Sequence, residues 1–174
     1  MSVTIEQRQE QLIRLREQEH SRCVVCGTSH PTGLRLEFAV RQDGSVEGSF
    51  LCTPNLQGYA NTLHGGVVAS LVDGAMTNCL FAHGIVAVTG ELTVRILCPI
   101  STGSTVKIEA SLERSLSPVY HLAAKLFQGE TMVAKASGTF VESQFAQKLG
   151  RYQKGSCGDG NIESPSQTHI HSQS

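Results

Sequence analysis

Residues 67–81 are apolar on nearly every helical face, and this segment limits the possible folds of the chain more than any other. Val68, Leu71 and Val72 follow helical spacing, while further apolar residues occupy the remaining faces. A helix that is apolar nearly all round is expected to be buried. Gly84 follows it as a plausible stop signal. The sequence therefore predicts one central helix that other elements cover.

Strand-like segments follow this helix in close succession. They alternate or cluster apolar residues as β-strands do, over residues 85–97, 104–114, 120–127 and 131–141. Turn residues separate them: Pro99 and Gly103, then Ser117-Pro118, then Gln128-Gly129-Glu130. Short connections between consecutive strands predict an antiparallel meander.

The chain before the central helix supplies two more strands and a peripheral helix. Residues 34–40 alternate apolar with polar side chains, Asp43-Gly44 signals a hairpin turn, and residues 46–52 form the returning strand. Residues 3–19 contain good helix formers with a thin apolar face, which predicts a helix on the outside of the domain. Residues 54–63 form an irregular loop that leads to the central helix.

This order of elements predicts an α+β hotdog fold, an antiparallel sheet of about six strands wrapped round a central helix. We expect an N-terminal helix over residues 1–22 and the hotdog domain over residues 23–145. Residues 146–174 are rich in glycine and serine with almost no apolar content, which predicts a disordered tail.

Composition excludes several other classes of protein. The 174 residues suffice for one domain, and a net charge of −1 gives no basic excess for binding nucleic acid. No run of 18 apolar residues occurs, so no membrane span is expected. The polar N-terminus does not resemble a signal peptide, which favours a cytoplasmic location. The six cysteines are accordingly expected to be reduced rather than paired in disulfides.

The candidate chemistry lies where the central helix begins. His64 and Gly65 open the helix, and Asp73 lies in its middle among apolar neighbours. Free N–H groups at a helix start can hold a developing negative charge, and a carboxylate in apolar surroundings can act as base or nucleophile. A rise of ~1.5 Å per residue separates Gly65 from Asp73 by roughly 12 Å. One reacting carbonyl cannot touch both, so a symmetric dimer must bring Gly65 of one chain to Asp73 of its partner.

These parts suit acyl transfer to water, with the Gly65 N–H polarising the carbonyl and Asp73 attacking it or activating water. The structural alternative is that the glycines only allow a sharp turn and that His64 only caps the helix. Asp73 is harder to explain in this way, because an unpaired carboxylate among apolar side chains is costly.

Four stretches carry a family resemblance: HGGVVASLVDGAM, TGELTVRILCPISTGSTV, MVAKASGTF and the opening CVVCG…HPTGLRLEF. Over roughly residues 23–142 the chain resembles the hotdog-fold acyl-CoA thioesterases of the PaaI-like and 4-hydroxybenzoyl-CoA thioesterase type. The resemblance implies a homodimer, often paired into a tetramer, that hydrolyses an acyl-CoA thioester without a cofactor.

The resemblance also implies roles for individual residues. Gly65 would polarise the thioester carbonyl through its backbone N–H, and Asp73 of the opposing subunit would be nucleophile or general base. His64 would support the thioester or its leaving group. Thr89, on the strand after the helix, looks like the position that orients water; the alternative is an ordinary β-branched strand residue.

One position departs from the family pattern. Many relatives carry Asn or Gln six residues before the histidine, where this chain has Gly58. Gln57 is the preferred replacement and Asn61 the second candidate. Gly66 completes the expected substrate-binding residues of the loop and helix start. The phosphates of coenzyme A are expected to meet basic side chains on the strands, chosen from Arg95, Lys107 and Arg114.

Cys23 and Cys26, with His30 beyond them, form an incomplete zinc pattern. A structural zinc ion needs four ligands, and the remaining histidines, His169 and His171, lie in the tail. We therefore expect no metal, and a tight turn with small buried thiols is the preferred interpretation. A redox role is disfavoured because the pair does not lie at a strand-to-helix junction.

A second class of function remains open. The same fold could serve as a non-catalytic acyl-CoA-binding or assembly module, and Asp73 distinguishes the two interpretations because only the enzyme needs its carboxylate. A dehydratase is disfavoured, since its His/Asp pattern is not evident. The sequence leaves the acyl group and the choice between dimer and tetramer undetermined.

Overall fold

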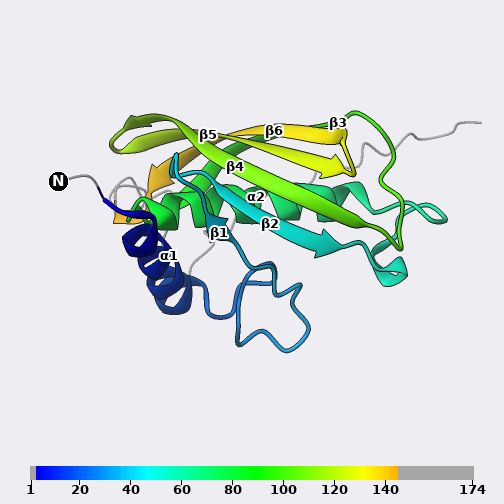
Figure 1. Cartoon of the computed structure of the whole chain (residues 1–174), viewed down its shortest axis with the longest axis horizontal. Helices are drawn as coiled ribbons and strands as arrows, with labels where there is room; N and C mark the ends of the chain where they lie inside the picture. Colours follow the sequence, from blue (N-terminus) through cyan, green and yellow to red (C-terminus); the bar gives the residue numbers. More distant parts are fainter. Residues whose placement is uncertain (1–2, 145–174) are drawn as a thin grey trace, which may run out of the picture.

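The sheet wraps around one long helix, as the sequence predicted (Figure 1). This computed structural model describes residues 3–144; the predicted tail at 146–174 lies outside them. In chain order the elements are α1 (Ile5–His20), β1 (Ala39–Val40), β2 (Val46–Leu51), the short 3-10 helix η1 (Pro54–Leu56), α2 (Gly65–Ala82), β3 (Ala87–Ile96), β4 (Thr105–Leu116), β5 (Val119–Gln128) and β6 (Thr131–Glu142). The predicted α+β hotdog fold is confirmed.

The strand order corrects one prediction. All neighbouring strands are antiparallel, but the six-stranded order is β1-β2-β4-β5-β6-β3, so only β4, β5 and β6 form a meander. β3 pairs with β6 at one edge of the sheet instead of with β4. The connection after β3 does not turn back but passes the start of α2, where the carbonyl of buried Ile100 accepts from the Leu63 N–H at 2.8 Å. Sequence spacing alone does not distinguish such a crossing from a turn.

The predicted strand at residues 34–40 is also shorter than expected, because only Ala39–Val40 pair with β2. The alternation itself was correct, since Leu36, Phe38 and Val40 are buried and the residues between them are exposed. The segment finds other partners for its backbone: Leu36 donates to the Val25 carbonyl, and Val40 donates to the side chain of Gln9 on α1. These hydrogen bonds satisfy backbone groups that would otherwise pair with β2, so the ladder to β2 is short.

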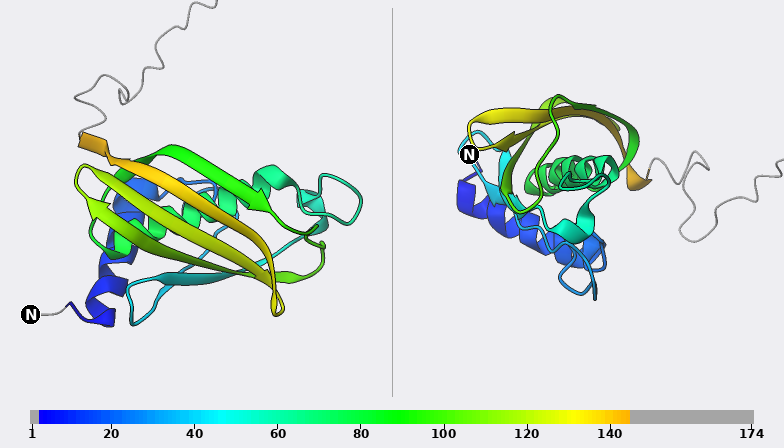
Figure 2. Two further views of the ribbon diagram at one scale, coloured as in Figure 1. Left: turned by 90° about the horizontal axis from the view of Figure 1, so that it is seen from above. Right: turned by 90° about the vertical axis from the view of Figure 1, so that its right-hand side faces the viewer.

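Helix α2 supplies the centre of the core. Twelve of its residues are buried, and the sheet curls over it while α1 packs on the side that the sheet leaves open (Figure 2). Leu12 of α1 is fully buried in the same core. By length and hydropathy α2 could cross a membrane, but 67% of that stretch is buried inside the domain, which accounts for its apolar character. Gly84, with φ +75°, ends the helix as predicted.

Gly74 of α2 is the contact point for the turn at residues 23–26. A Cβ at this position would lie 2.5 Å from Val25 Cγ1, well inside contact distance, and both residues are buried. The missing side chain therefore lets the turn lie directly on the helix, one residue after Asp73.

Replacing Gly74 by alanine should destabilise the fold by about 1–3 kcal/mol, as overpacking does. Helix propensity alone predicts the opposite sign, a gain of about 1 kcal/mol. Urea unfolding of Gly74→Ala, Val25→Ala and the double variant tests this. We expect the double variant to be more stable than the sum of the two single changes, because truncating Val25 removes the clash. Strict additivity would contradict the contact.

Candidate active site

Asp73 and Thr89 lie together in the structure. Asp73 is half-buried on α2, and the Thr89 hydroxyl of β3 donates to its Oδ1 at 2.7 Å within the same chain. Both residues come from the predicted site, and they are 16 positions apart in the sequence. The hydrogen bond from Thr89 holds the Asp73 carboxylate in one orientation. Its other oxygen, Oδ2, has no recorded hydrogen bond among the described residues and is available for a further contact.

A β-bulge makes this contact possible. Thr89 pairs with Phe140 and Glu91 with Thr139, so Gly90 is an extra residue in β3. Further along the strand, Leu92 pairs with the buried Gly138 and therefore faces α2. In a regular strand the residue three positions before Leu92 would face away from the helix. The bulge at Gly90 turns Thr89 to the helix side instead.

The surroundings of Asp73 shift its acidity. Burial raises the pKa of the Asp73 carboxyl above its ordinary value, and the hydrogen bond from Thr89 opposes part of that rise. Cys23 raises the pKa further and His20 lowers it, which shows that both side chains lie within electrostatic reach of Asp73. A carboxyl with a raised pKa binds a proton more readily than an ordinary one, as a general base requires.

The start of α2 presents one free amide. His64 is the N-cap residue, and its Nδ1 accepts from the Gly66 N–H at 2.9 Å. His64 therefore caps the helix, as the sequence analysis allowed. The N–H groups of Val67 and Val68 donate to the His64 carbonyl. Within the described part of the chain, the Gly65 N–H has no recorded hydrogen bond. Of the two glycines, Gly65 therefore offers the unpaired donor, while the Gly66 N–H is occupied by the cap.

The loop before α2 packs against His64. A Cβ on Gly58 would lie 3.0 Å from His64 Cδ2, so the imidazole rests on this glycine. The Gln57 side-chain oxygen accepts from the Asn61 N–H at 3.1 Å, and Asn61 adopts φ +59°. Gln57 and Asn61 thus shape the turn in this chain, and no recorded contact brings either side chain to Asp73.

Exposed apolar side chains lie on β3, at its end and on the loop before α2, and one of them approaches the free amide. β3 ends the strand order, so one side of it carries no neighbouring strand within the described residues. Ile96 approaches Gly65, because a Cβ on the glycine would lie 3.4 Å from Ile96 Cδ1. Ile96 and Leu97 are 46% and 40% exposed, and Tyr59 in the loop before α2 is 86% exposed. Large apolar side chains therefore lie open to solvent beside the start of α2.

The basic candidates separate into two groups. Arg95 is exposed on β3, and its cross-strand neighbour on β6 is Lys135, which in turn faces Lys125 on β5. Three cations thus stand in one row on the outer face of the sheet, and the row continues from Lys125 to Glu109 on β4. Arg114 lies on β4 opposite His121, away from this row.

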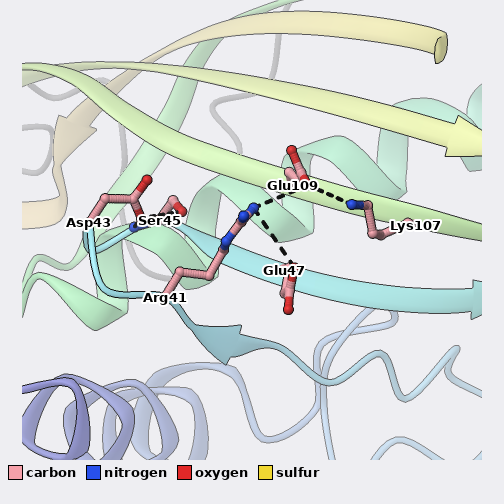
Figure 3. A network of polar contacts seen from close by, with 6 residues as sticks. All are labelled: Arg41, Asp43, Ser45, Glu47, Lys107 and Glu109. Carbon is pink, nitrogen blue, oxygen red and sulfur yellow. Dashed lines mark hydrogen bonds and ion pairs between the residues drawn. The ribbon is translucent and has the colours of Figure 1, made fainter. Parts of the chain in front are cut away.

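Lys107 belongs to a different network, shown in Figure 3. It forms an ion pair with Glu109 at 2.8 Å, and Arg41 contacts the same carboxylate at 3.1 Å and Glu47 at 3.8 Å. The two acidic residues balance these cations, so Lys107 is a weaker candidate for an anionic ligand than Arg95.

In the structure the histidine beside Cys23 and Cys26 is His20 and not His30. His20 joins Cys23 and Cys26, and their ligand atoms all lie within 4.8 Å of one another. His30, which the sequence offered as a partner, instead accepts from the Thr32 N–H through Nδ1. His20 lies at the end of α1, within the predicted N-terminal helical region of residues 1–22, but nothing in the sequence spacing indicated that its side chain would reach this turn.

Comparison with known proteins finds a family that resembles the region of this site. Residues 60–135 match the sequence model of the Thioesterase superfamily, a range that contains Gly65, Asp73 and Thr89. The PaaI protein of E. coli, from the phenylacetic acid degradation operon, shares the fold with a TM-score of 0.67 at 17% identity, over 80% of this chain and 96% of that one. The predicted resemblance to PaaI-like hotdog thioesterases is confirmed.

Two further structures share the fold. RHA08564, a thioesterase superfamily protein, matches with a TM-score of 0.66 at 22% identity over 70% of this chain, which spans 61% of that protein. The protein smu.793 from Streptococcus mutans UA159, solved bound to acetyl CoA, matches with a TM-score of 0.59 at 19% identity, over 62% of this chain and 88% of that one. At these identities the likeness establishes the fold.

Proposed function

We propose that this protein is an acyl-CoA thioesterase that works as a homodimer with composite active sites. One observation carries the proposal: α2 holds a half-buried carboxylate, Asp73, and a free amide, Gly65 N–H, that lie too far apart to serve one substrate within one chain. Eight residues of helix separate them by roughly 12 Å. Two antiparallel copies of α2 would bring each amide to the carboxylate of the other chain.

The chemistry follows from these two groups. The Gly65 N–H donates to the thioester carbonyl oxygen and stabilises the oxyanion that forms when the acyl carbon is attacked. Asp73 either takes the proton of the attacking water or attacks the carbon itself, and in both routes it must be ionised. In the second route the acyl group is transferred to Asp73 as an anhydride, and a water molecule then hydrolyses it to the free acid and the regenerated carboxylate. Collapse of the intermediate breaks the carbon–sulfur bond, and coenzyme A leaves as the thiol after taking up a proton. His64 lies beside Gly65 and is placed to donate to the leaving sulfur through its other ring nitrogen.

Coenzyme A as the carrier is supported by the family match over residues 60–135 and by the relative solved with acetyl CoA. The exposed edge of β3 and the apolar rim at Tyr59, Ile96 and Leu97 support a second copy of the chain as the occupant of that face. We propose a cytoplasmic dimer, with pairing into a tetramer as a further step.

Mixing two inactive variants tests the composite site. Gly65→Pro removes the amide hydrogen, and Asp73→Asn removes the base. A heterodimer of the two variants contains one site with both groups intact and one with neither. Random pairing makes half of the dimers mixed, so about one quarter of wild-type acyl-CoA hydrolysis should return. Activity is measured on short, long and aromatic acyl-CoAs after refolding the variants together, with each variant refolded alone as control.

Two different negative results would contradict the shared site and the enzymatic activity, respectively. If the mixture stays as inactive as its parents while size-exclusion chromatography shows dimers, the sites are not shared between chains. If the wild-type protein binds acyl-CoAs and hydrolyses none, the non-catalytic binding module replaces the enzyme.

Replacing Thr89 by valine should move the acid limb of the pH–rate profile to higher pH. The Thr89 hydroxyl favours the ionised carboxylate and so lowers the pKa of Asp73, against the rise caused by burial. Without that bond the pKa rises further, and a higher pH is needed to ionise the base. The profile of kcat/KM against pH measures the shift. Thr93→Val, on the outward face of the same strand, should leave the profile unchanged; a shift of Thr89→Val to lower pH would contradict this role.

Arg95 should contribute to binding the coenzyme A phosphates. Arg95→Ala is expected to raise KM for an acyl-CoA by roughly 2–5-fold, the range of exposed ion pairs, with kcat retained. The same acyl group on N-acetylcysteamine, which carries no phosphate, should show no change. Arg41→Ala, whose guanidinium contacts Glu109, is the matched control on the sheet. An equal loss with both thioesters would assign Arg95 another role.

A further inference from the structure

The buried side-chain atoms that lack hydrogen bonds belong to residues around Cys26, since Asn78 and Arg16 act on its pKa and His20 lies beside its sulfur. Among the described residues, the buried side-chain nitrogen and oxygen atoms without a partner are Arg16 Nε, His20 Nδ1 and Asn78 Oδ1. Arg16 and His20 lie on α1 and Asn78 on α2. Buried polar atoms are usually paired, and each one left unpaired costs about 1–3 kcal/mol. Two of the three, His20 Nδ1 and Asn78 Oδ1, can offer a lone pair and indicate a missing electron-pair acceptor, whereas Arg16 Nε can only donate.

Two cysteines complete this cluster. Cys23 and Cys26 lie in the turn after α1, and their sulfur atoms and a ring nitrogen of His20 are mutually within 4.8 Å. The donor atoms of a tetrahedral zinc site with sulfur and nitrogen ligands lie about 3.5–3.8 Å apart. Small side-chain rotations therefore suffice to close the three groups around one ion. The His20 ring also packs edge-on against Phe81 at 5.2 Å, which limits its orientations.

Charged groups surround the cluster on several sides. The Cys26 thiol donates to the Cys23 sulfur, which lowers the pKa of Cys23 and raises that of Cys26. Arg16 lies within electrostatic reach of Cys26, and Asp73 within reach of Cys23 and His20. A zinc ion binds cysteine as thiolate and releases the Cys26 proton as it binds, so two thiolates then neutralise the cation and Asp73 balances the positive Arg16.

We propose that Cys23, Cys26 and His20 bind one zinc ion between α1 and α2, with the oxygen of Asn78 as the fourth donor. A disulfide between the two cysteines would leave the His20 and Asn78 atoms still unpaired, whereas a cation accepts lone pairs from both. Asn78 is suited to this role because its amide nitrogen already donates to the Gly74 carbonyl at 2.8 Å, which fixes the side chain while its oxygen stays free.

Metal analysis and cobalt substitution of the full chain test this site. Protein purified without chelator under reducing conditions should contain about one zinc ion per chain, and removing the zinc should lower the melting temperature. Adding Co²⁺ to the metal-free protein should produce sulfur-to-cobalt charge-transfer bands in the near ultraviolet and the visible bands of tetrahedral cobalt.

Variants locate the ligands. Cys23→Ser and His20→Gln should weaken Co²⁺ binding by more than about 100-fold, whereas Cys98→Ser, at a half-buried free cysteine elsewhere, should bind as the wild type does. The wild-type titration needs no substitution, so its result does not depend on the folding of a variant. Absence of cobalt bands in the reduced wild-type chain overturns the proposal, as does formation of a Cys23–Cys26 disulfide in place of metal uptake. These measurements use no thioester, so they stand apart from the proposed activity.

Discussion

Asp73→Asn will lower kcat for acyl-CoA hydrolysis by about 10²–10⁴-fold, the contribution of a positioned base. The amide keeps the size and shape of the carboxylate and can still accept the hydrogen bond from Thr89, but it can neither take a proton nor attack the substrate. Because burial raises the pKa of Asp73, the charged form is the one that burial disfavours, and the neutral amide should fold at least as stably. Steady-state kinetics and thermal unfolding measure the two effects.

Asp43→Asn is the matched control, since Asp43 is the other aspartate among residues 3–144 and lies in the turn between β1 and β2. It accepts hydrogen bonds from Ser45 and belongs to no proposed site. We expect its kcat to equal that of the wild type. A dimeric, folded Asp73→Asn protein that keeps wild-type kcat would remove the carboxylate from the mechanism.

Gly65→Pro should lower kcat by about 10²–10³-fold, as loss of one oxyanion donor does. Gly65 is the first residue of α2, the position at which a helix tolerates proline because no intrahelical bond needs its N–H. The residue before a proline must be extended, and His64 already has φ −63° and ψ 134°. The substitution therefore removes the backbone N–H hydrogen of residue 65 with little change to the backbone conformation.

Gly65→Ala provides the control because it keeps the N–H. Its Cβ would lie 3.4 Å from Ile96 Cδ1, an approach that the flexible end of that side chain can accommodate. We expect Gly65→Ala to keep most of the activity, and circular dichroism should show equal helix content for both variants. Equal activity of the proline and alanine variants would show that this amide does not hold the oxyanion.

The parts of the fold that depend on local pattern could be predicted from the sequence. Helix α2 follows from residues that are apolar on all faces, and its end follows from Gly84. The hairpin at Gly44 and the strands β4 to β6 follow from alternation and turn residues. The proposal that Asp73 works with Gly65 of a second chain rests on helix geometry, since the rise per residue sets the distance between the two residues.

The parts that depend on tertiary contacts could not be predicted. The place of β3 beside β6 is decided by a crossing that sequence spacing does not reveal. The direction of Thr89 is decided by the bulge at Gly90, which adds one residue without any local signature beyond a glycine. His20 reaches the two cysteines only because α1 packs against α2, and the hydrogen bond of His64 to Gly66 needs the folded start of the helix.

That last contact gives the two amides at the start of α2 different roles. The Nδ1 atom of His64 accepts from the Gly66 N–H, so the cap occupies that donor and leaves the Gly65 N–H without a recorded hydrogen bond. The residue that caps the helix therefore also decides which backbone hydrogen a bound molecule can meet.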